Sequence, residues 1–183
     1  MKIQSLAISD VKLITPDRFG DQRGYFEQTY HQRDYAAAGI NTGFVQDNFS
    51  RSRKDVLRGM HYQLKAPQAK LVTIFYGSVY DVVIDLRHSS PTFGSWLGVE
   101  LSAQSGTQLF VPRGFAHGFL VTSDTVGFHY KCDAFYDASD EHSIAWDDPD
   151  VKVDWPLQNA PSLSAKDSAA PKLRTLTEQQ YFA

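Results

Sequence analysis

The feature that most restricts the fold is a succession of short apolar segments, rich in β-branched and aromatic residues, that are separated by turn residues. Residues 70–76 and 78–86 are two such segments on either side of Gly77, so they predict a β-hairpin or a tight bend. Further strands are predicted at residues 96–101, 107–111, 118–122 and 126–132. Repeated short strands of this kind are typical of a β-sandwich or barrel.

Helical patterns are few. Residues 33–38, closed by Gly39, and residues 175–180 are predicted to be helical. Because no helix alternates with the strands, the pattern argues against a parallel α/β fold. There is no internal repeat or linker, so we expect a single domain over residues 1–183. The polar, proline-bearing segment from Asp147 onward is expected to wrap the surface of the sheet.

The composition excludes several classes of protein. With 183 residues, 42% of them hydrophobic, the chain has material for a substantial core. Eighteen Lys and Arg against twenty-one Asp and Glu argue against a nucleic-acid or membrane-surface partner. Residues 1–11 lack a signal-like apolar core and no uncharged run approaches about 20 residues, so we expect a cytoplasmic protein. The single cysteine, Cys132, rules out an internal disulfide.

The segment 56–63 (VLRGMHYQ) is predicted to be a strand. Strict alternation places Arg58 on one face, with Met60 and Tyr62, and places His61 on the other face with Gln63. If the second face lines a barrel interior, the imidazole is partly desolvated and can transfer protons near neutral pH. The alternative is a structural histidine, hydrogen-bonded in the core.

The segment 106–118 (GTQLFVPRGFAHG) resembles the second sequence motif of the cupin superfamily. In cupins a histidine at the His117 position often binds metal with two histidines and a glutamate from an earlier strand pair. Here Gln63 stands where the second histidine is expected, and no glutamate lies between His61 and Gly77. Two histidines supply too few ligands for a tight site. We therefore predict an all-β, cupin-like jelly-roll barrel or sandwich with a few short helices, which works without metal.

Three further side chains are ambiguous by themselves. Tyr130 lies in a ring-rich strand, where a tyrosine usually packs, although a phenol in a polar cavity could donate a proton. Lys70 opens an apolar strand; it is either a solvated strand end or a cation that stabilises developing negative charge. Asp167 is either a surface residue or, if the tail folds back, a carboxylate that orients an imidazole.

Several separated motifs, taken together, are similar to one family. They are residues 19–24 (FGDQRG), 44–48 (FVQDN), 56–63, 68–72 (QAKLV), 90–94 (SPTFG), 112–119 (PRGFAHGF), 130–131 (YK) and 163–167 (LSAKD). In this order, over nearly the whole length, the chain resembles the dTDP-4-dehydrorhamnose 3,5-epimerases, the dTDP-sugar epimerase family of rhamnose biosynthesis.

The resemblance implies roles for individual residues. It makes His61 the base, Asp167 its hydrogen-bonded partner, Tyr130 the acid and Lys70 the cation near the ketone oxygen. Residues that match ligand-binding positions of the family are Arg23 and Arg58 for the diphosphate, Tyr136 near the nucleotide, and Glu27, Gln46, Asn48, His117, Glu141 and Lys166 for other contacts. It also implies a homodimer that exchanges amino-terminal segments, so that Arg23 serves the neighbouring subunit's site.

The implied chemistry uses no cofactor. In a dTDP-4-keto-6-deoxyhexose the ketone acidifies the hydrogens at carbons 3 and 5, so a base can form an enolate and an acid on the opposite face can invert the centre. Inversion of both carbons is the leading hypothesis. A monofunctional 3- or 5-epimerase is the alternative; a metal-dependent cupin enzyme and a nucleotide-sugar binding module without turnover are the rivals from other classes.

Overall fold

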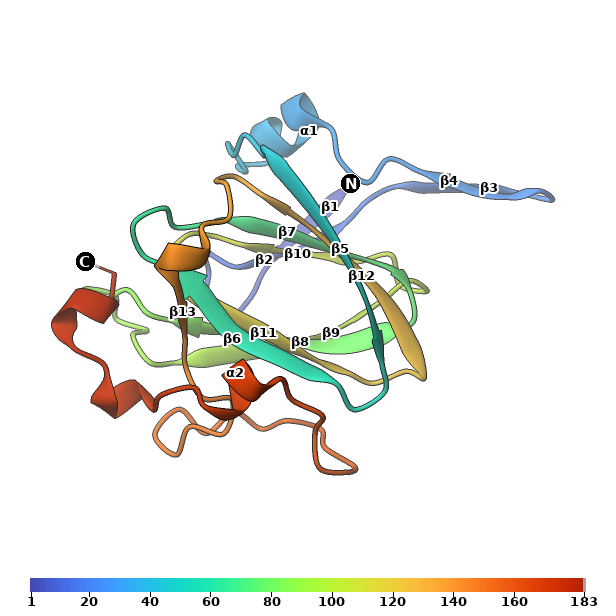
Figure 1. Ribbon diagram of the computed structural model, residues 1–183. Coiled ribbons are helices and arrows are strands. Elements are labelled where there is room, and N and C mark those ends of the chain that lie inside the picture. The colour runs from blue at the N-terminus through green and yellow to red at the C-terminus, as the bar shows by residue number, and fades with distance from the viewer. Residues whose placement is uncertain (183) are drawn as a thin grey trace.

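Two antiparallel β-sheets face each other and form a barrel, with a separate hairpin that projects from it (Figure 1). The computed structural model describes residues 1–182. The six-stranded sheet has the order β1 (Lys2–Ser5), β2 (Lys12–Thr15), β10 (Gln108–Val111), β7 (Lys70–Tyr76), β12 (Thr125–Cys132) and β5 (Gln46–Arg53). The five-stranded sheet has the order β13 (Glu141–Ser143), β6 (Leu57–Gln63), β11 (Phe115–Val121), β8 (Ser78–Asp85) and β9 (Trp96–Ser102).

The projecting hairpin consists of β3 (Arg18–Asp21) and β4 (Gly24–Glu27). The helices are short. They are α1 (Gln32–Ala37), α2 (Ala165–Ser168) and 3-10 turns at Ala138–Asp140, Leu173–Thr175 and Glu178–Gln180. None of the helices in the described part of the chain has the length and apolar character needed to cross a membrane.

The prediction of an all-β barrel or sandwich with a few short helices is confirmed. Each strand predicted in the middle of the chain is present, with its ends displaced by a few residues at most. The helix predicted at 175–180 is wrong, because the backbone there forms only 3-10 turns on either side of residues 176–177. The sequence pattern also missed α2, which is a single turn and too short to show a periodicity.

Apolar side chains pack on both faces of the five-stranded sheet. The inner faces of the two sheets bury a core that includes Val72, Val83 and Phe128. The outer face of the five-stranded sheet is covered by the carboxy-terminal segment, which packs Trp155, Leu163 and other side chains on it. The expectation that this segment wraps a sheet is thereby confirmed, and the wrapping brings residues 163–168 next to β6.

A register shift between β6 and β11 decides which side chains of β6 enter the barrel. His61 pairs with His117, whereas Arg58 pairs with Phe119. Between these two pairs β6 advances by three residues, while β11 advances by only two. The one extra residue in β6 reverses the alternation of its side chains between the two faces of the sheet. Arg58 and His61 therefore line the same cavity, and the prediction that they lie on opposite faces is wrong. Gly59 is required here, because a Cβ at its position would lie 2.5 Å from the Gly118 Cα.

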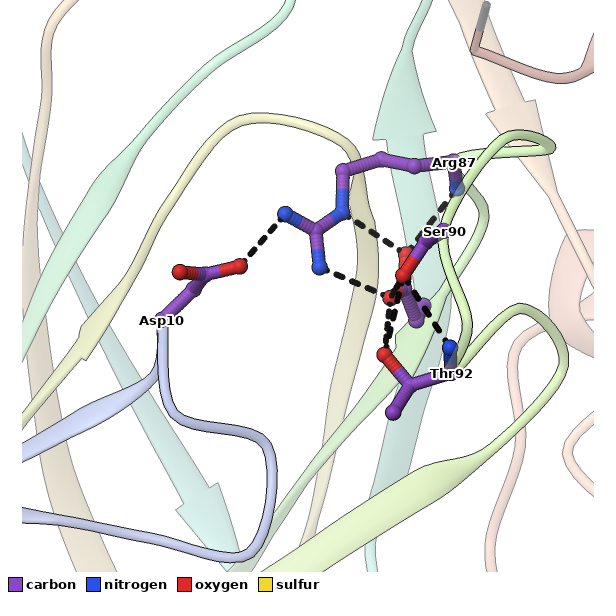
Figure 2. A network of polar contacts seen from close by, with 5 residues as sticks. Asp10, Arg87, Ser90 and Thr92 are labelled. Carbon is purple, nitrogen blue, oxygen red and sulfur yellow. Dashed lines mark hydrogen bonds and ion pairs between the residues drawn. The ribbon is translucent and has the colours of Figure 1, made fainter.

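A buried carboxylate fixes the loop that follows β8. Asp85 accepts hydrogen bonds from the Arg87 guanidinium and from the hydroxyls of Ser90 and Thr92, the last two at 2.7 Å. Arg87 also pairs with Asp10 of the amino-terminal segment, as Figure 2 shows. The 90–94 motif is thus explained structurally, since its Ser90 and Thr92 hydroxyls hold the loop after β8 to Asp85.

Candidate active site

A cavity of about 320 Å³ opens into the barrel and is lined from both sheets. The six-stranded sheet contributes Asn48, Phe49, Ser50, Lys70, Phe128 and Tyr130, and the five-stranded sheet contributes Arg58, His61, His117, Gly118 and Phe119. Polar and ionisable groups therefore converge on apolar walls, an arrangement typical of a small-molecule site.

His61 is paired with a carboxylate from the tail. Its Nε2 lies 2.6 Å from Asp167 Oδ1, and Asp167 is only 4% exposed. Burial acts to raise the pKa of Asp167, but hydrogen bonds from His61 and Ser164 outweigh it and hold the pKa below its usual value. An ionised Asp167 accepts from Nε2–H, which leaves Nδ1 as the ring nitrogen that can take up a proton.

Tyr130 and Lys70 face the same cavity from adjacent strands. Burial raises the pKa of the Tyr130 phenol to about 12, with the nearby Cys132 and Glu141 adding to the effect, so the phenol is protonated at neutral pH. Burial lowers the pKa of Lys70, whose Nζ lies 6.0 Å from the centre of the Tyr130 ring. The cavity thus holds a protonated phenol beside a desolvated lysine side chain.

A second histidine–aspartate pair lies next to the first. His117 Nε2 is 2.8 Å from Asp81 Oδ1; His117 is 7% exposed and Asp81 is fully buried. Asp81 Oδ2 is a buried oxygen without a hydrogen-bond partner among the described residues. Because His61 and His117 are directly opposite each other on β6 and β11, the two imidazoles lie side by side in the cavity wall.

A polar network extends from the cavity to the surface. The Gln46 side chain donates to Asn48 Oδ1 at 2.9 Å and accepts from the Tyr136 backbone N–H. The exposed Tyr136 phenol donates to Glu141, which also pairs with Lys166. Burial opposes ionisation of Glu141, yet the hydrogen bonds from Lys166 and Tyr136 hold its pKa below the usual value. Four predicted ligand-contacting residues are thus connected to a fifth, Asn48, that lines the cavity.

Two predicted binding residues lie away from the cavity. Arg23 is at the tip of the β3–β4 hairpin, which points away from the barrel in Figure 1, and it pairs with Asp21 in solvent. Glu27 is at the base of the hairpin and pairs with Arg18. Within this chain, neither side chain is brought to the other predicted residues.

The donors at the cupin metal position do not fit a metal ion. Both imidazoles direct Nε2 at an aspartate, and the Gln63 amide donates to the carbonyl oxygens of Ala66 and Phe135. Among residues 1–182, no group of three or more His, Cys, Asp or Glu side chains is arranged to hold a metal.

The sequence reasoning missed two residues at the site. Asp81 interrupts the apolar strand 78–86, and a charged residue at a buried strand position could have signalled a pair. Ser164 stands three residues before Asp167, a spacing typical of a helix N-cap. Neither signal predicts which histidine contacts the carboxylate.

The fold and the cavity together define a class. A β-barrel whose interior gathers an imidazole–carboxylate pair, a protonated phenol and an ammonium group is equipped for proton transfer at carbon, as in an isomerase.

Comparison with known proteins identifies the family. The family model for dTDP-4-dehydrorhamnose 3,5-epimerase matches residues 5–175. The Pseudomonas aeruginosa dTDP-4-dehydrorhamnose 3,5-epimerase is 52% identical over 91% of this chain and 93% of its own. A Legionella pneumophila dTDP-6-deoxy-D-glucose-3,5-epimerase, solved in complex with dTDP-4-keto-L-rhamnose, has a TM-score of 0.97 at 44% identity, covering 99% of this chain and 97% of its own. A 3'-monoepimerase from Streptomyces bikiniensis, in complex with dTDP-quinovose, has a TM-score of 0.87 at 33% identity, covering 93% and 87%.

The chain belongs to the dTDP-4-dehydrorhamnose 3,5-epimerase family, and it is a carbohydrate epimerase with the cupin-like fold expected from its second motif.

Proposed function

We propose that this epimerase inverts carbons 3 and 5 of dTDP-4-dehydro-6-deoxyglucose to give dTDP-4-dehydro-L-rhamnose in rhamnose biosynthesis. The observation that carries the proposal is the cavity itself, where the His61–Asp167 pair and the Tyr130 phenol are presented from opposite sheets. A sugar between the two sheets has one face toward the imidazole and the other toward the phenol, which is what inversion requires.

In this mechanism His61 removes a proton next to the ketone. Asp167 fixes the ring by accepting from Nε2–H and stabilises the imidazolium that forms. The C–H electron pair moves into the ring to give an enolate, and the charge develops on the ketone oxygen. Lys70 is the cation at the cavity wall that stabilises this oxygen.

Tyr130 then returns a proton to the opposite face of the same carbon. Its high pKa keeps the proton in place until a strongly basic enolate forms. After one inversion the imidazolium releases its proton and the phenolate is reprotonated, so that the second centre can follow by the same steps. Apolar walls at Phe119 and Phe128 exclude water from the intermediate.

We assign the nucleotide end of the substrate to the outer part of the cavity. Arg58 is exposed beside the cavity and has its guanidinium Nε hydrogen-bonded to Ser52, which suits it to diphosphate oxygens. The exposed ring of Tyr136 is a surface on which a base can stack. Contacts far from the reacting carbons orient the sugar rather than change its chemistry.

We also propose a homodimer that exchanges the β3–β4 hairpin. Phe19, Tyr25 and Phe26 on this hairpin are 59–67% exposed, and Phe49 (55%) and Phe75 (49%) on the six-stranded sheet are exposed as well. Apolar side chains exposed to this extent favour a partner surface. Arg23, which lies outside its own cavity, would then complete the diphosphate site of the other subunit.

The reaction is tested by incubating the protein with dTDP-4-keto-6-deoxyglucose in deuterated water and locating the label by NMR. We expect label at both carbons with the wild type and none with His61→Ala. Undiminished exchange in His61→Ala would remove His61 from the base role. Label at one carbon alone would favour the monofunctional alternative, which the similarity to a 3'-monoepimerase keeps as the second candidate.

The exchanged hairpin is tested by mixing two inactive variants, Arg23→Ala and His61→Ala, after unfolding and refolding them together. If Arg23 serves the partner, a mixed dimer has one complete site and activity returns to about a quarter of the wild-type value per subunit, the statistical share of competent sites. No recovery, with mixed dimers shown by a mass tag, would place Arg23 in its own subunit's site.

A further inference from the structure

Ser164 makes two hydrogen bonds to the residue that holds His61. It is the N-cap of α2, where its Oγ accepts from the Asp167 backbone N–H at 3.1 Å. The same hydroxyl donates to Asp167 Oδ2 at 2.8 Å. His61 occupies Oδ1, so the two oxygens of this buried carboxylate have different partners.

We propose that Ser164 is the positioning residue of the His61–Asp167 pair, an inference that rests on the proposed function. Its hydroxyl does not line the cavity and reaches the substrate only through Asp167 and His61. Donation to Oδ2 fixes the rotation of the carboxylate, and this rotation aims Oδ1 at Nε2. Ser164, Asp167 and His61 thus form a chain that ends at the reacting carbon.

Burial makes this role specific. Asp167 is 4% exposed and receives the Ser164 hydroxyl at Oδ2, although Ser164 itself lies at the exposed end of α2. If the hydroxyl is removed, Oδ2 loses its protein donor, and a water in its place would hold the carboxylate less rigidly. The hydrogen bond to His61 is then weakened, although no group that touches substrate has changed.

The segment around α2 is held independently of the Ser164 hydroxyl. On one side, Ser162 exchanges backbone hydrogen bonds with Asp55 and Leu57, at 2.7 and 3.0 Å. On the other side, the Pro171 carbonyl accepts from the Ala145 N–H at 2.8 Å. These two attachments flank α2, so a variant at position 164 keeps the segment on β6 and reports on the carboxylate rather than on the fold.

The test compares Ser164→Ala, Ser164→Thr and Ser164→Asp by kcat, KM and melting temperature. Because the lost bond is to a charged group, we expect Ser164→Ala to lower kcat about 10- to 100-fold with KM within about twofold. A loss confined to kcat, at an unchanged melting temperature, separates a positioning role from a structural defect. Thr keeps the hydroxyl and should restore most of the activity.

Ser164→Asp separates the cap from the positioning role. An aspartate can accept from the Asp167 N–H and retain the cap, but it cannot donate and it brings a second negative charge to the carboxylate. We expect it to keep the melting temperature and to lose more activity than Ser164→Ala. Ser168→Ala is the matched control, since Ser168 lies in the same turn and bonds only to the Ser164 carbonyl.

Wild-type kcat in Ser164→Ala, or a loss of kcat that only follows a lowered melting temperature, would overturn the inference while leaving the proposed function intact. If Ser164→Asp kept both its melting temperature and its activity, the inference would also be overturned, because the role of Ser164 would then be to cap α2. A wild-type protein without exchange, or a fully active His61→Ala, would instead overturn the proposed function and the inference with it.

Discussion

The two histidine–aspartate pairs at the cavity contain the same side chains, but they are supported by different parts of the fold. Asp167 comes from a tail helix outside the barrel, whereas Asp81 belongs to β8, the strand adjacent to its histidine. The His61 side chain is 29% exposed and His117 only 7%. Both oxygens of Asp167 have partners, while one oxygen of Asp81 has none among the described residues.

The difference supports separate roles for the two pairs. His61 has solvent access on one side of its ring and a fully bonded carboxylate on the other, so it can exchange a proton while its orientation is fixed. His117 is enclosed by the sheet, close to Phe128, and its ring is held by Asp81, so it is suited to orient a ligand group. We therefore place proton transfer at the first pair and ligand orientation at the second.

The largest expected effect is that of Asp167→Asn. The asparagine keeps the shape of the side chain but can present an N–H to Nε2, which favours the wrong imidazole tautomer, and a loss of about a thousandfold or more in kcat is expected. Single-turnover exchange into the sugar would measure it. If Asp81→Asn lost as much kcat as Asp167→Asn, the division of roles between the two pairs would fail.

Tyr130→Phe should follow in size. Removal of the phenol eliminates the acid but leaves the base, so we expect kcat to fall about a hundredfold to ten-thousandfold while proton removal continues. Exchange of deuterium without inversion is the diagnostic result, read as labelled substrate in place of product. A variant that inverts normally would assign the acid to another residue.

Asp85→Asn should have the next largest effect, on stability rather than on kcat. Asp85 is a buried carboxylate on the same strand as Asp81, and it does not line the cavity. Its pKa is lowered to about 2 because hydrogen bonds from Arg87, Thr92 and Ser90 outweigh the effect of burial. A folded pKa below the unfolded value stabilises the protein above about pH 4, and this contribution is lost as the pH falls toward 2. At pH 7 we expect the free energy of unfolding to fall by roughly 2 kcal/mol, with kcat unchanged. Urea titrations of both proteins at pH 7 and pH 3 measure this, and an equal difference at the two values would contradict it.

Asp81→Asn tests the second pair through its effect on the pKa of Lys70. The expected change, a shift of the pH profile, is the smallest of the four. Burial lowers the pKa of Lys70, and the negative charge of Asp81 partly opposes this. Removal of the charge lowers the lysine pKa further, so the alkaline limb of kcat/KM should move to lower pH. Asp85→Asn is the matched control, and an unmoved alkaline limb would show that Asp81 does not act on Lys70.

The sequence predicted the barrel and most of its strands because turn residues and β-branched runs are local signals. It also identified most of the cavity, although the roles came from the resemblance rather than from the pattern. What it missed depends on contacts between distant segments. The pairing of Asp81 with His117 needs the β8–β11 register, and the placement of Arg58 beside His61 needs the single-residue shift against β11. Strict alternation cannot reveal such a shift.

The wrapping of the barrel by residues 147–182 has a consequence for the order in which the protein matures. During synthesis all the strands of the barrel emerge before Asp167, so the cavity can assemble while its imidazole still lacks the carboxylate partner. A protease that cut the exposed loop at residues 157–160 would break the covalent link between the strands and the tail after the barrel has assembled. Such a nicked protein would retain its sheets but would lose its activity whenever the tail dissociated. The rate of turnover would therefore measure the fraction of molecules whose tail is bound.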